Sequence, residues 1–309
     1  MKTKSLSKNL KHILRYGENP SQSAYLINYS KNSIFNYQIN GKKISYNNLI
    51  DLDSGLKCLG EFNEPTSIIV KHTNPCGVAS AKKINLAFTK SYNSDPKSAF
   101  GGIIFLNRKI NSELASRIIQ NFFEMVVAPH YDELAIEILK QRKNLILIKI
   151  PNLKKQIIEY KSTLFGDLYQ TKDLTKINKK FLKLVSKKKG STKSIDDLIF
   201  SLKVAKHLKS NAIVLSSNKQ TLGLGHGQTN RVDALNFALK NMKKYFKNKF
   251  FVCASDGFFP FTDSISLLNK NGCSVIAQPS GSINDKKITS FSIRNKISLY
   301  YIKNRLFKH

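Results

Sequence analysis

Short apolar runs alternate with segments of helical period along most of the chain. The apolar runs predict buried strands at residues 67–71, 103–106, 124–129, 145–150, 212–216, 221–225, 250–254, 274–278 and 298–302. Apolar residues at helical spacing predict helices at residues 81–93, 112–123, 132–143, 195–208 and 231–244. Residues 151–194 are rich in lysine and are expected to form an exposed connector with some ordered structure. Strands that alternate with helices in this way predict a layered α/β architecture.

One stretch joins a predicted strand directly to titratable side chains. Residues 67–70, Ser-Ile-Ile-Val, lead into Lys71 and His72. The chain is then expected to break at Asn74 and Pro75, and Gly77 is expected to open a segment of helical period. The pattern predicts a buried strand that delivers two titratable groups to a turn. Taken alone, such a pair is more often an ordinary strand end with a solvated lysine and a hydrogen-bonded histidine.

Three further loops carry glycine, aromatic or charged residues. The glycine pair at 101–102 follows an aromatic residue and either lets the backbone approach a flat ligand or relieves crowding at a strand start. The glycine-rich stretch 223–231 lacks the G-x-G-x-x-G spacing and the following acidic residue of a dinucleotide-binding site, which argues against such a site. Arg231, in the first turn of the helix that follows, suits an anion. The aromatic loop 256–263 either plugs the core or stacks on a ring ligand.

Composition limits the class of protein. The 309 residues, 41% of them hydrophobic, suffice for one large domain or two of about 150 residues. No apolar run reaches the ~20 residues of a membrane-spanning helix, and the N-terminus lacks an apolar signal region, so we expect a cytoplasmic protein without membrane contact. The four cysteines have no C-x-x-C spacing and are expected to be small buried thiols, with no metal site.

The formal charge of +31 raises the possibility of nucleic-acid binding. Only seven of the 51 basic residues are arginines, however, and arginine is the residue usually placed for bidentate phosphate or base recognition. Enrichment in lysine, asparagine and isoleucine is what an AT-rich genome imposes on permissive surface positions. We therefore expect weak adhesion to nucleic acid at low salt and no specific nucleic-acid partner.

Six stretches, in this order, resemble the family of AICAR transformylases, the C-terminal part of the bifunctional purine biosynthesis enzymes. The stretches are Leu-Arg-Tyr-Gly-Glu-Asn-Pro at 14–20, Lys-His-Thr-Asn-Pro-Cys-Gly at 71–77, Ser-Ala-Phe-Gly-Gly at 98–102, Gly-His-Gly-Gln-Thr-Asn-Arg at 225–231, Asp-Gly-Phe-Phe-Pro-Phe-Thr-Asp at 256–263 and Pro-Ser-Gly-Ser at 279–282. The terminal Arg-Leu-Phe at 305–307 and the Ser-Asn at 210–211 match as well. The similarity covers residues from about 13 to 309.

The resemblance implies two cytidine-deaminase-like three-layer halves, produced by internal duplication, without the catalytic zinc of the deaminases. We expect a basic arm at 1–12, a first half at 13–165, a connector at 166–191 and a second half at 192–309. The implied reaction transfers a formyl group from the co-substrate 10-formyltetrahydrofolate to the 5-amino group of AICAR, giving FAICAR in de novo IMP biosynthesis. The implied assembly is a homodimer with shared active sites. A structural monovalent cation and a separate IMP cyclohydrolase partner are left open.

The resemblance also implies roles for fourteen residues. Lys71 and His72 would be the catalytic pair. The implied substrate-binding residues are Arg15, Tyr16, Gly101, Glu124, Asn211, Arg231, Phe258, Arg305 and Phe307. The implied folate-binding residues are Pro260, Asp263 and Ser282. A neutral imidazole can remove a proton from the poorly nucleophilic amine during attack, and the lysine can either stabilise the oxyanion or protonate the departing folate nitrogen.

The sequence departs from the family pattern at several positions. His226 stands where a small residue is usual, Asn230 where serine is common, and Glu124 where some members carry aspartate. The family's cyclohydrolase domain precedes the Arg-Tyr-Gly motif, which lies near the start of this sequence, so we expect no ring closure by this chain. The alternative function is that of a catalytically decayed homologue that retains nucleotide binding for interaction or regulation.

Overall fold

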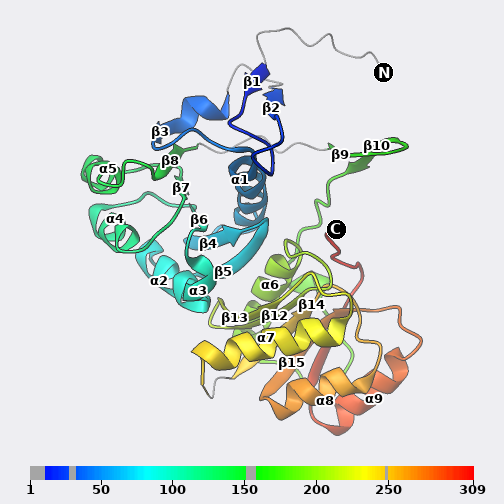
Figure 1. Ribbon diagram of the computed structural model, residues 1–309. Coiled ribbons are helices and arrows are strands. Elements are labelled where there is room, and N and C mark those ends of the chain that lie inside the picture. Colours follow the sequence, from blue (N-terminus) through cyan, green and yellow to red (C-terminus); the bar gives the residue numbers. More distant parts are fainter. Residues whose placement is uncertain (1–10, 28–32, 151–157, 248–249) are drawn as a thin grey trace.

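The computed structural model describes residues 11–27, 33–150, 158–247 and 250–309. Within these ranges the chain forms a 12-stranded mixed sheet, two two-stranded sheets and nine α-helices (Figure 1). The predicted α/β class is confirmed. Most of the expected basic arm lies outside the described residues. In the described part of the chain, no helix is long and apolar enough to cross a membrane.

The first half of the molecule, residues 33–150, follows a short N-terminal hairpin. That hairpin consists of β1 (Lys11–Ile13) and β2 (Tyr25–Ile27). The elements of the first half are η2 (Ile34–Tyr37), β3 (Gln38–Asn40), α1 (Tyr46–Leu59), β4 (Thr66–Lys71), β5 (Asn74–Ser80), α2 (Ile84–Ser94), α3 (Pro96–Ala99), β6 (Ile103–Leu106), α4 (Ser112–Ile119), β7 (Met125–Ala128), α5 (Glu133–Lys140) and β8 (Ile146–Lys149).

The second half, residues 192–309, is reached through a segment with its own hairpin. This segment contains β9 (Ile158–Thr163), β10 (Gly166–Thr171), η3 (Lys179–Phe181) and β11 (Lys183–Leu184). The elements of the second half are α6 (Thr192–Ala205), β12 (Ile213–Ser217), β13 (Gln220–Gly225), α7 (Arg231–Tyr245), β14 (Phe251–Ser255), α8 (Thr262–Lys270), β15 (Cys273–Pro279), α9 (Asp285–Arg294) and β16 (Ser298–Ile302).

The two halves have the same strand order and the same strand directions. The first half-sheet runs β5-β4-β6-β7-β8 and the second runs β13-β12-β14-β15-β16. In each half-sheet, the second strand pairs antiparallel with both of its neighbours, and the last three strands are parallel to one another. Each half thus repeats one arrangement of five strands.

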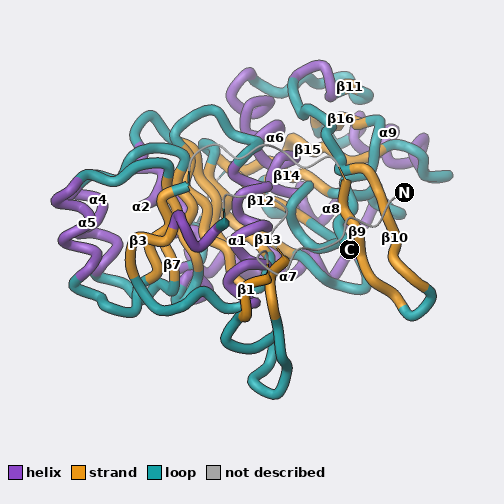
Figure 2. Tube along the Cα trace, turned by 90° about the horizontal axis from the view of Figure 1, so that it is seen from above, coloured by secondary structure: helices purple, strands orange, loops and turns teal. Residues whose placement is uncertain are grey.

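Helices cover both faces of the large sheet. Side chains alternate along each strand, so Ile68 and Val70 of β4 pack with α1 and α6, whereas Ile69 packs with α2, α4 and α5. In the second half, Val252 of β14 packs with α6, and Phe251 packs with α7, α8 and α9. The molecule is therefore a three-layer stack with α1 and α6 on one side (Figures 1 and 2).

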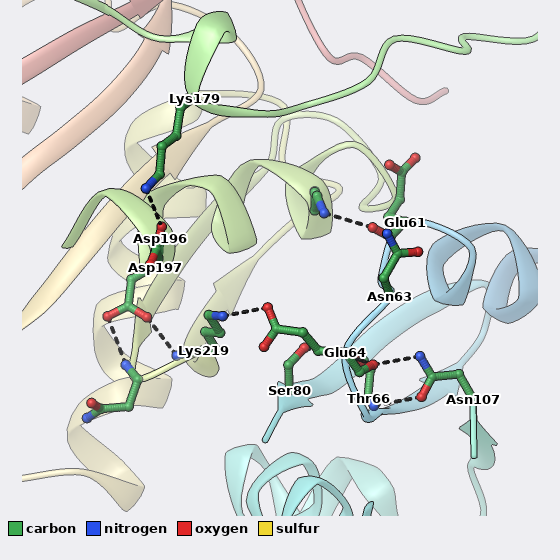
Figure 3. A network of polar contacts seen from close by, with 12 residues as sticks. Glu61, Asn63, Glu64, Thr66, Ser80, Asn107, Lys179, Asp196, Asp197 and Lys219 are labelled. Atoms are coloured by element: carbon green, nitrogen blue, oxygen red, sulfur yellow. Dashed lines mark hydrogen bonds and ion pairs between the residues drawn. The ribbon is translucent and has the colours of Figure 1, made fainter. Parts of the chain in front are cut away.

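The two half-sheets meet where β13 lies beside β5. In the described part of the chain one strand pairing joins them, Gln220 with Ala79, and next to it the Oγ1 of Thr221 accepts a hydrogen bond from the Val78 amide at 3.0 Å. Polar side chains also connect the two halves (Figure 3). Among these contacts, Nζ of Lys219 lies 2.5 Å from Oε1 of Glu64. Side chains thus supply much of the connection between the halves.

The prediction for the segment after His72 is wrong. Residues 74–80 form strand β5, and Gly77 lies inside this strand and does not open a helix. Proline is tolerated at position 75 because β5 pairs with β13 only near its other end, so no second ladder needs an amide there. Gly77 is required by close packing, since a Cβ at this position would lie 2.0 Å from the carbonyl oxygen of Ser91 in α2.

The hairpin β9–β10 projects away from both halves (Figures 1 and 2). Leu164 and Phe165 at its tip are each 100% exposed, and Leu168 and Tyr169 are exposed as well. An ion pair between Lys57 of α1 and Glu159 of β9, 2.7 Å long, ties the base of this hairpin to the first half. The expected connector therefore contains an ordered arm with an apolar tip.

Candidate functional site

The strand register places most of the predicted site residues at one edge of the large sheet. The end of β4 lies with the starts of β5, β6 and β7, and the start of β12 lies with the ends of β13 to β16. The antiparallel bridge between β5 and β13 brings these two sets to the same edge. The predicted residues that follow or precede these strand ends are Lys71, His72, Gly101, Glu124, Asn211, Arg231, Phe258, Pro260, Asp263, Ser282, Arg305 and Phe307.

His72 and Thr73 form the two-residue turn between β4 and β5. Lys71 pairs with Asn74, and both turn residues have positive φ, 52° for His72 and 64° for Thr73, as hairpins with such short loops require. Neither residue is glycine, so the left-handed backbone costs about 1 kcal/mol or more at each position. The expected delivery of Lys71 and His72 to a turn is confirmed, and that turn is strained.

Hydrogen bonds from helix α1 stabilise this turn. Oδ1 of Asp51 accepts a hydrogen bond from the Thr73 amide at 2.6 Å, and the Ser54 hydroxyl donates to the Thr73 carbonyl at 2.6 Å. Burial raises the pKa of Asp51, against the opposing effects of the Thr73 amide and the nearby His72. The His72 side chain is exposed and free to meet a ligand. The strain in the turn is thus offset by hydrogen bonds on the Thr73 side, which faces α1, whereas the His72 side chain is exposed.

Lys71 lies beside the glycine pair that the sequence singled out. Its Nζ donates to the carbonyl oxygen of Phe100 at 2.8 Å. Gly101 has a φ of 73°, which favours glycine, and its amide donates to Phe122. The chain then turns into β6, so the ammonium group of Lys71 is held against the start of a neighbouring strand.

Glu124 is already engaged by two first-half side chains. Nδ2 of Asn48 donates to its Oε2 at 3.1 Å, and Nζ of Lys42 lies 3.4 Å from its Oε1. The loop with Arg15 and Tyr16 lies near the same end of α1, since Nδ2 of Asn47 donates to the carbonyl oxygen of Glu18 at 3.1 Å. The Arg15 guanidinium lies 5.0 Å from the centre of the Tyr16 ring.

In the second half, Arg231 is held in a buried ion pair. Its Nη1 lies 2.5 Å from Oδ1 of Asp256, and its Nε donates to the Phe258 carbonyl at 3.1 Å. Burial lowers the pKa of Arg231, and the charge of Asp256 opposes this effect. Gly257 is needed here, because a Cβ would lie 2.1 Å from Nη2 of Arg231 and 2.9 Å from the ring of Phe307. The guanidinium therefore has a structural partner.

The C-terminal tail completes this group. The Leu306 amide donates to the Asp256 carbonyl at 2.9 Å, and the Arg305 guanidinium lies 5.0 Å from the centre of the Phe307 ring. Asn211 donates from Nδ2 to the Gln228 carbonyl at 2.9 Å. The second-half residues that were predicted to bind a nucleotide thus lie around the start of β12 and the ends of β13, β14 and β16.

The predicted folate residues lie beside the ends of β14 and β15. Nδ2 of Asn284 donates to the Pro260 carbonyl at 2.8 Å, and its amide donates to Oγ of Ser282 at 3.1 Å. Oδ1 of Asp263 accepts a hydrogen bond from the following amide in the first turn of α8. In the aromatic loop, Phe259 is fully buried whereas Phe261 is 62% exposed, so the loop both fills the core and presents an exposed ring.

A pocket of about 430 Å³ opens beside Lys71 and His72, between β5, α2, β13 and α7. Of the fourteen predicted residues, only Lys71 and His72 line it. Lys97 and Lys244, which have no local signal in the sequence, also line the pocket. His226 lines it too, and its pKa is lowered by burial and by the charge of Lys308.

Asp51 and Lys308 also lack a local signal of a place near this site. Asp51 belongs to a helix without a clear apolar stripe, and Lys308 is one lysine among many. The signal for Asp256 was present in the aromatic loop, which is bracketed by carboxylates. Among the described residues, three cysteines are buried as expected and Cys76 is partly buried, all four thiols are free, and no cluster of three histidine, cysteine or acidic residues could hold a metal.

Comparison with known proteins finds one matching family and several similar curated proteins. The family model described as "AICARFT/IMPCHase bienzyme" matches residues 1–241. Three similar curated proteins carry the name "Bifunctional purine biosynthesis protein PurH". The protein from Caldicellulosiruptor bescii is 44% identical over 97% of this chain and 60% of its own length. The one from Buchnera aphidicola subsp. Schizaphis graminum is 43% identical over 97% of this chain and 59% of its own length. The one from Limosilactobacillus reuteri is 38% identical over 99% of this chain and 61% of its own length.

These matches cover nearly the whole chain, which spans about 60% of the length of the curated relatives. The names of these relatives assign them to purine biosynthesis. The chain therefore belongs to the AICARFT/IMPCHase bienzyme family.

Proposed function

We propose that this chain transfers the formyl group of 10-formyltetrahydrofolate to the 5-amino group of AICAR, giving FAICAR on the route to IMP. One observation carries the proposal: Lys71, at the end of β4, and His72, in the strained turn that follows, lie at the same sheet edge as the second-half group around Arg231 and Phe307. Family membership narrows the chemistry to purine biosynthesis.

The proposed chemistry gives different roles to His72 and Lys71. The lone pair of the substrate amine is delocalised into the imidazole and carboxamide, so the amine needs a base as it attacks. The exposed imidazole of His72 would take that proton. The ammonium of Lys71 would stabilise the tetrahedral oxyanion or protonate the departing folate nitrogen.

The proposed binding sites follow the groups at the sheet edge. The nucleotide pocket would be formed by the residues Arg15, Tyr16, Gly101, Glu124, Asn211, Arg231, Phe258, Arg305 and Phe307, with Arg15 on the phosphate. Because Arg231 already pairs with Asp256, its role would be to hold the aromatic loop and present Phe258, with Arg305 as the more exposed cation. Pro260, Asp263 and Ser282 would face the folate.

We also propose a homodimer in which each active site draws residues from both subunits. The arm formed by β9 and β10 supports this, because its apolar tip has no cover within one described chain. The repeated strand order supports a further proposal, that the halves arose by duplication of a cytidine-deaminase-like unit. Localisation in the cytoplasm stays a prediction.

The formyl-transfer proposal is tested by following tetrahydrofolate release with AICAR and 10-formyltetrahydrofolate, for wild type and for His72→Asn. Asparagine tolerates the left-handed backbone of this turn, so the variant removes the imidazole without disturbing the hairpin. We expect kcat to fall about 10²- to 10⁴-fold. Near-full activity of His72→Asn would remove His72 from the mechanism.

The alternative, a catalytically decayed homologue, is distinguished in the same assay. It predicts ribotide binding without tetrahydrofolate release by the wild type. We further propose that the part of the bifunctional relatives that this chain spans carries formyl transfer and not closure of the inosine ring, so FAICAR should accumulate without IMP. Formation of IMP by the purified chain would contradict that part of the proposal.

A further inference from the structure

A side chain from the far end of the sequence holds the turn that carries His72. Nζ of Lys308 donates hydrogen bonds to the Thr73 carbonyl at 3.0 Å, to Oγ of Ser54 at 3.1 Å and to the His207 carbonyl at 3.0 Å. These acceptors belong to the turn, to α1 and to the segment that follows α6. One lysine therefore joins three parts of the chain, and one of its acceptors is the residue next to the proposed base.

The contacts of Lys308 are directional. Three donated hydrogen bonds require three N–H groups, so the side chain is an ammonium in this arrangement. The Ser54 hydroxyl gives its own hydrogen to Thr73, which leaves an oxygen lone pair for Lys308. Burial lowers the pKa of Lys308, and the nearby charges of Asp53 and Glu159 oppose this effect. The ammonium group of Lys308 is therefore held by three specific hydrogen bonds, unlike that of a solvated surface lysine.

The backbone around Lys308 is fixed to the second half. The Leu306 amide donates to Asp256, and the Lys308 carbonyl accepts from the Ser210 amide at 2.9 Å. Phe307 lies between these two anchors. The tail thus carries a proposed nucleotide-binding ring on the second half, while the next side chain reaches across to the catalytic turn of the first half.

We propose that Lys308 is a positioning residue for formyl transfer, whose ammonium fixes the His72–Thr73 turn relative to the nucleotide-binding tail. The inference rests on the proposed function, because it takes His72 as the base. Lys308 acts through Thr73 and does not touch the reacting atoms. Without it, the turn keeps its strained backbone but loses one of the contacts that offset the strain, and the backbone that carries the imidazole is held less firmly.

The test compares Lys308→Met, which keeps the length of the side chain, with Lys308→Arg, which keeps charge and donors. Lys303→Met is the matched control, because Lys303 is an exposed lysine of the same tail. Three quantities are measured: kcat for formyl transfer, Kd for AICAR by calorimetry, and amide hydrogen exchange of peptides covering residues 71–76. Lys308→Met should lower kcat about 10- to 100-fold, as expected for a misplaced base.

The AICAR Kd of Lys308→Met should change less than about threefold, because the tail still binds the second half. Exchange at 71–76 should become faster, Lys308→Arg should recover most of kcat, and Lys303→Met should match wild type. If Lys308→Met does not fold, Lys308→Gln, which keeps two donors but no charge, replaces it with the same expected directions.

Unchanged kcat in a folded Lys308 variant would overturn the inference, as would equal losses in AICAR affinity and kcat. Absence of turnover in wild type would refute the proposed function instead. In that case the exchange comparison still decides the anchoring role, and unchanged exchange at residues 71–76 in Lys308→Met would overturn it.

Discussion

Arg231 and Asp256 form an ion pair in which the carboxylate is fully buried and the guanidinium side chain is 9% exposed. Removing the arginine would leave a buried carboxylate without its cation. We expect Arg231→Met to lower the free energy of unfolding by about 3 kcal/mol, measured by urea denaturation. The double variant with Asp256→Asn should recover part of this loss.

The surface pair of Arg117 and Glu113 serves as the control, since both side chains are about half exposed. Arg117→Met should cost no more than about 0.5 kcal/mol. An equally small effect of Arg231→Met would show that Asp256 does not depend on this partner, and would favour a direct role of the guanidinium in ligand binding.

His207 and Glu61 predict a loss of stability on acidification. Burial lowers the pKa of His207 below its ordinary 6.5, and the contacts with His207 and Lys206 outweigh burial and lower the pKa of Glu61 below 4.5. As the pH falls through 6.5, the unfolded chain gains a proton at His207 before the folded chain does, so the free energy of unfolding falls. Glu61 adds a further loss below 4.5, down to its lowered pKa.

Urea unfolding at about pH 7.5 and about pH 5.5 measures this dependence. His207→Gln should reduce the difference between the two pH values. The exposed His130 provides the control, and His130→Gln should leave the difference as in wild type. A wild-type protein that is more stable at the lower pH would contradict the assignment.

Gly77 is the point of closest approach between β5 and α2. We expect Gly77→Ala to lower the free energy of unfolding by about 2 kcal/mol, because the new Cβ would overlap the Ser91 carbonyl and force the helix to shift. Gly60→Ala is the matched substitution, since Gly60 has a φ of −64° and its Cβ would meet nothing nearer than 3.4 Å. Equal stability of the two variants would show that α2 moves without cost.

The arm formed by β9 and β10 predicts the assembly state. Leu164 and Phe165 are fully exposed at its tip, so the double variant Leu164→Ser with Phe165→Ser should shift a dimer toward monomer in sedimentation velocity. Leu134→Ser, on the exposed side of α5, should leave the mass unchanged. A double variant with the wild-type mass would place the dimer contact elsewhere.

Local pattern predicted those elements whose sequence and packing agree. The strand expected at residues 298–302 has these bounds in the structure, and the helix expected at residues 231–244 corresponds to α7. Helix α1 was missed because polar residues, including buried Asn48 and Ser54, interrupt its apolar face. Asn48 contacts Glu124 and Ser54 contacts Thr73 of the turn, so the same side chains that obscure the helix contact the candidate site.

The sequence could also not reveal which charges are already engaged. Arg231 and Glu124 read as free ligand-binding groups, but the structure pairs the first with Asp256 and the second with Lys42 and Asn48. Lys308 stands among many lysines, and only the fold brings it to Thr73. Long-range contacts of this kind have no local signature.

The single strand pairing between β5 and β13 has a mechanical consequence. Pulling an inner strand out of either half breaks ladders on both of its sides, whereas parting the two half-sheets breaks one pairing, the hydrogen bonds of Thr221 and a set of side-chain contacts. Under a stretching force applied across the sheet, the molecule should therefore yield first along this line. The tie made by Lys308 crosses it, and would be loaded before any strand is torn from its neighbours.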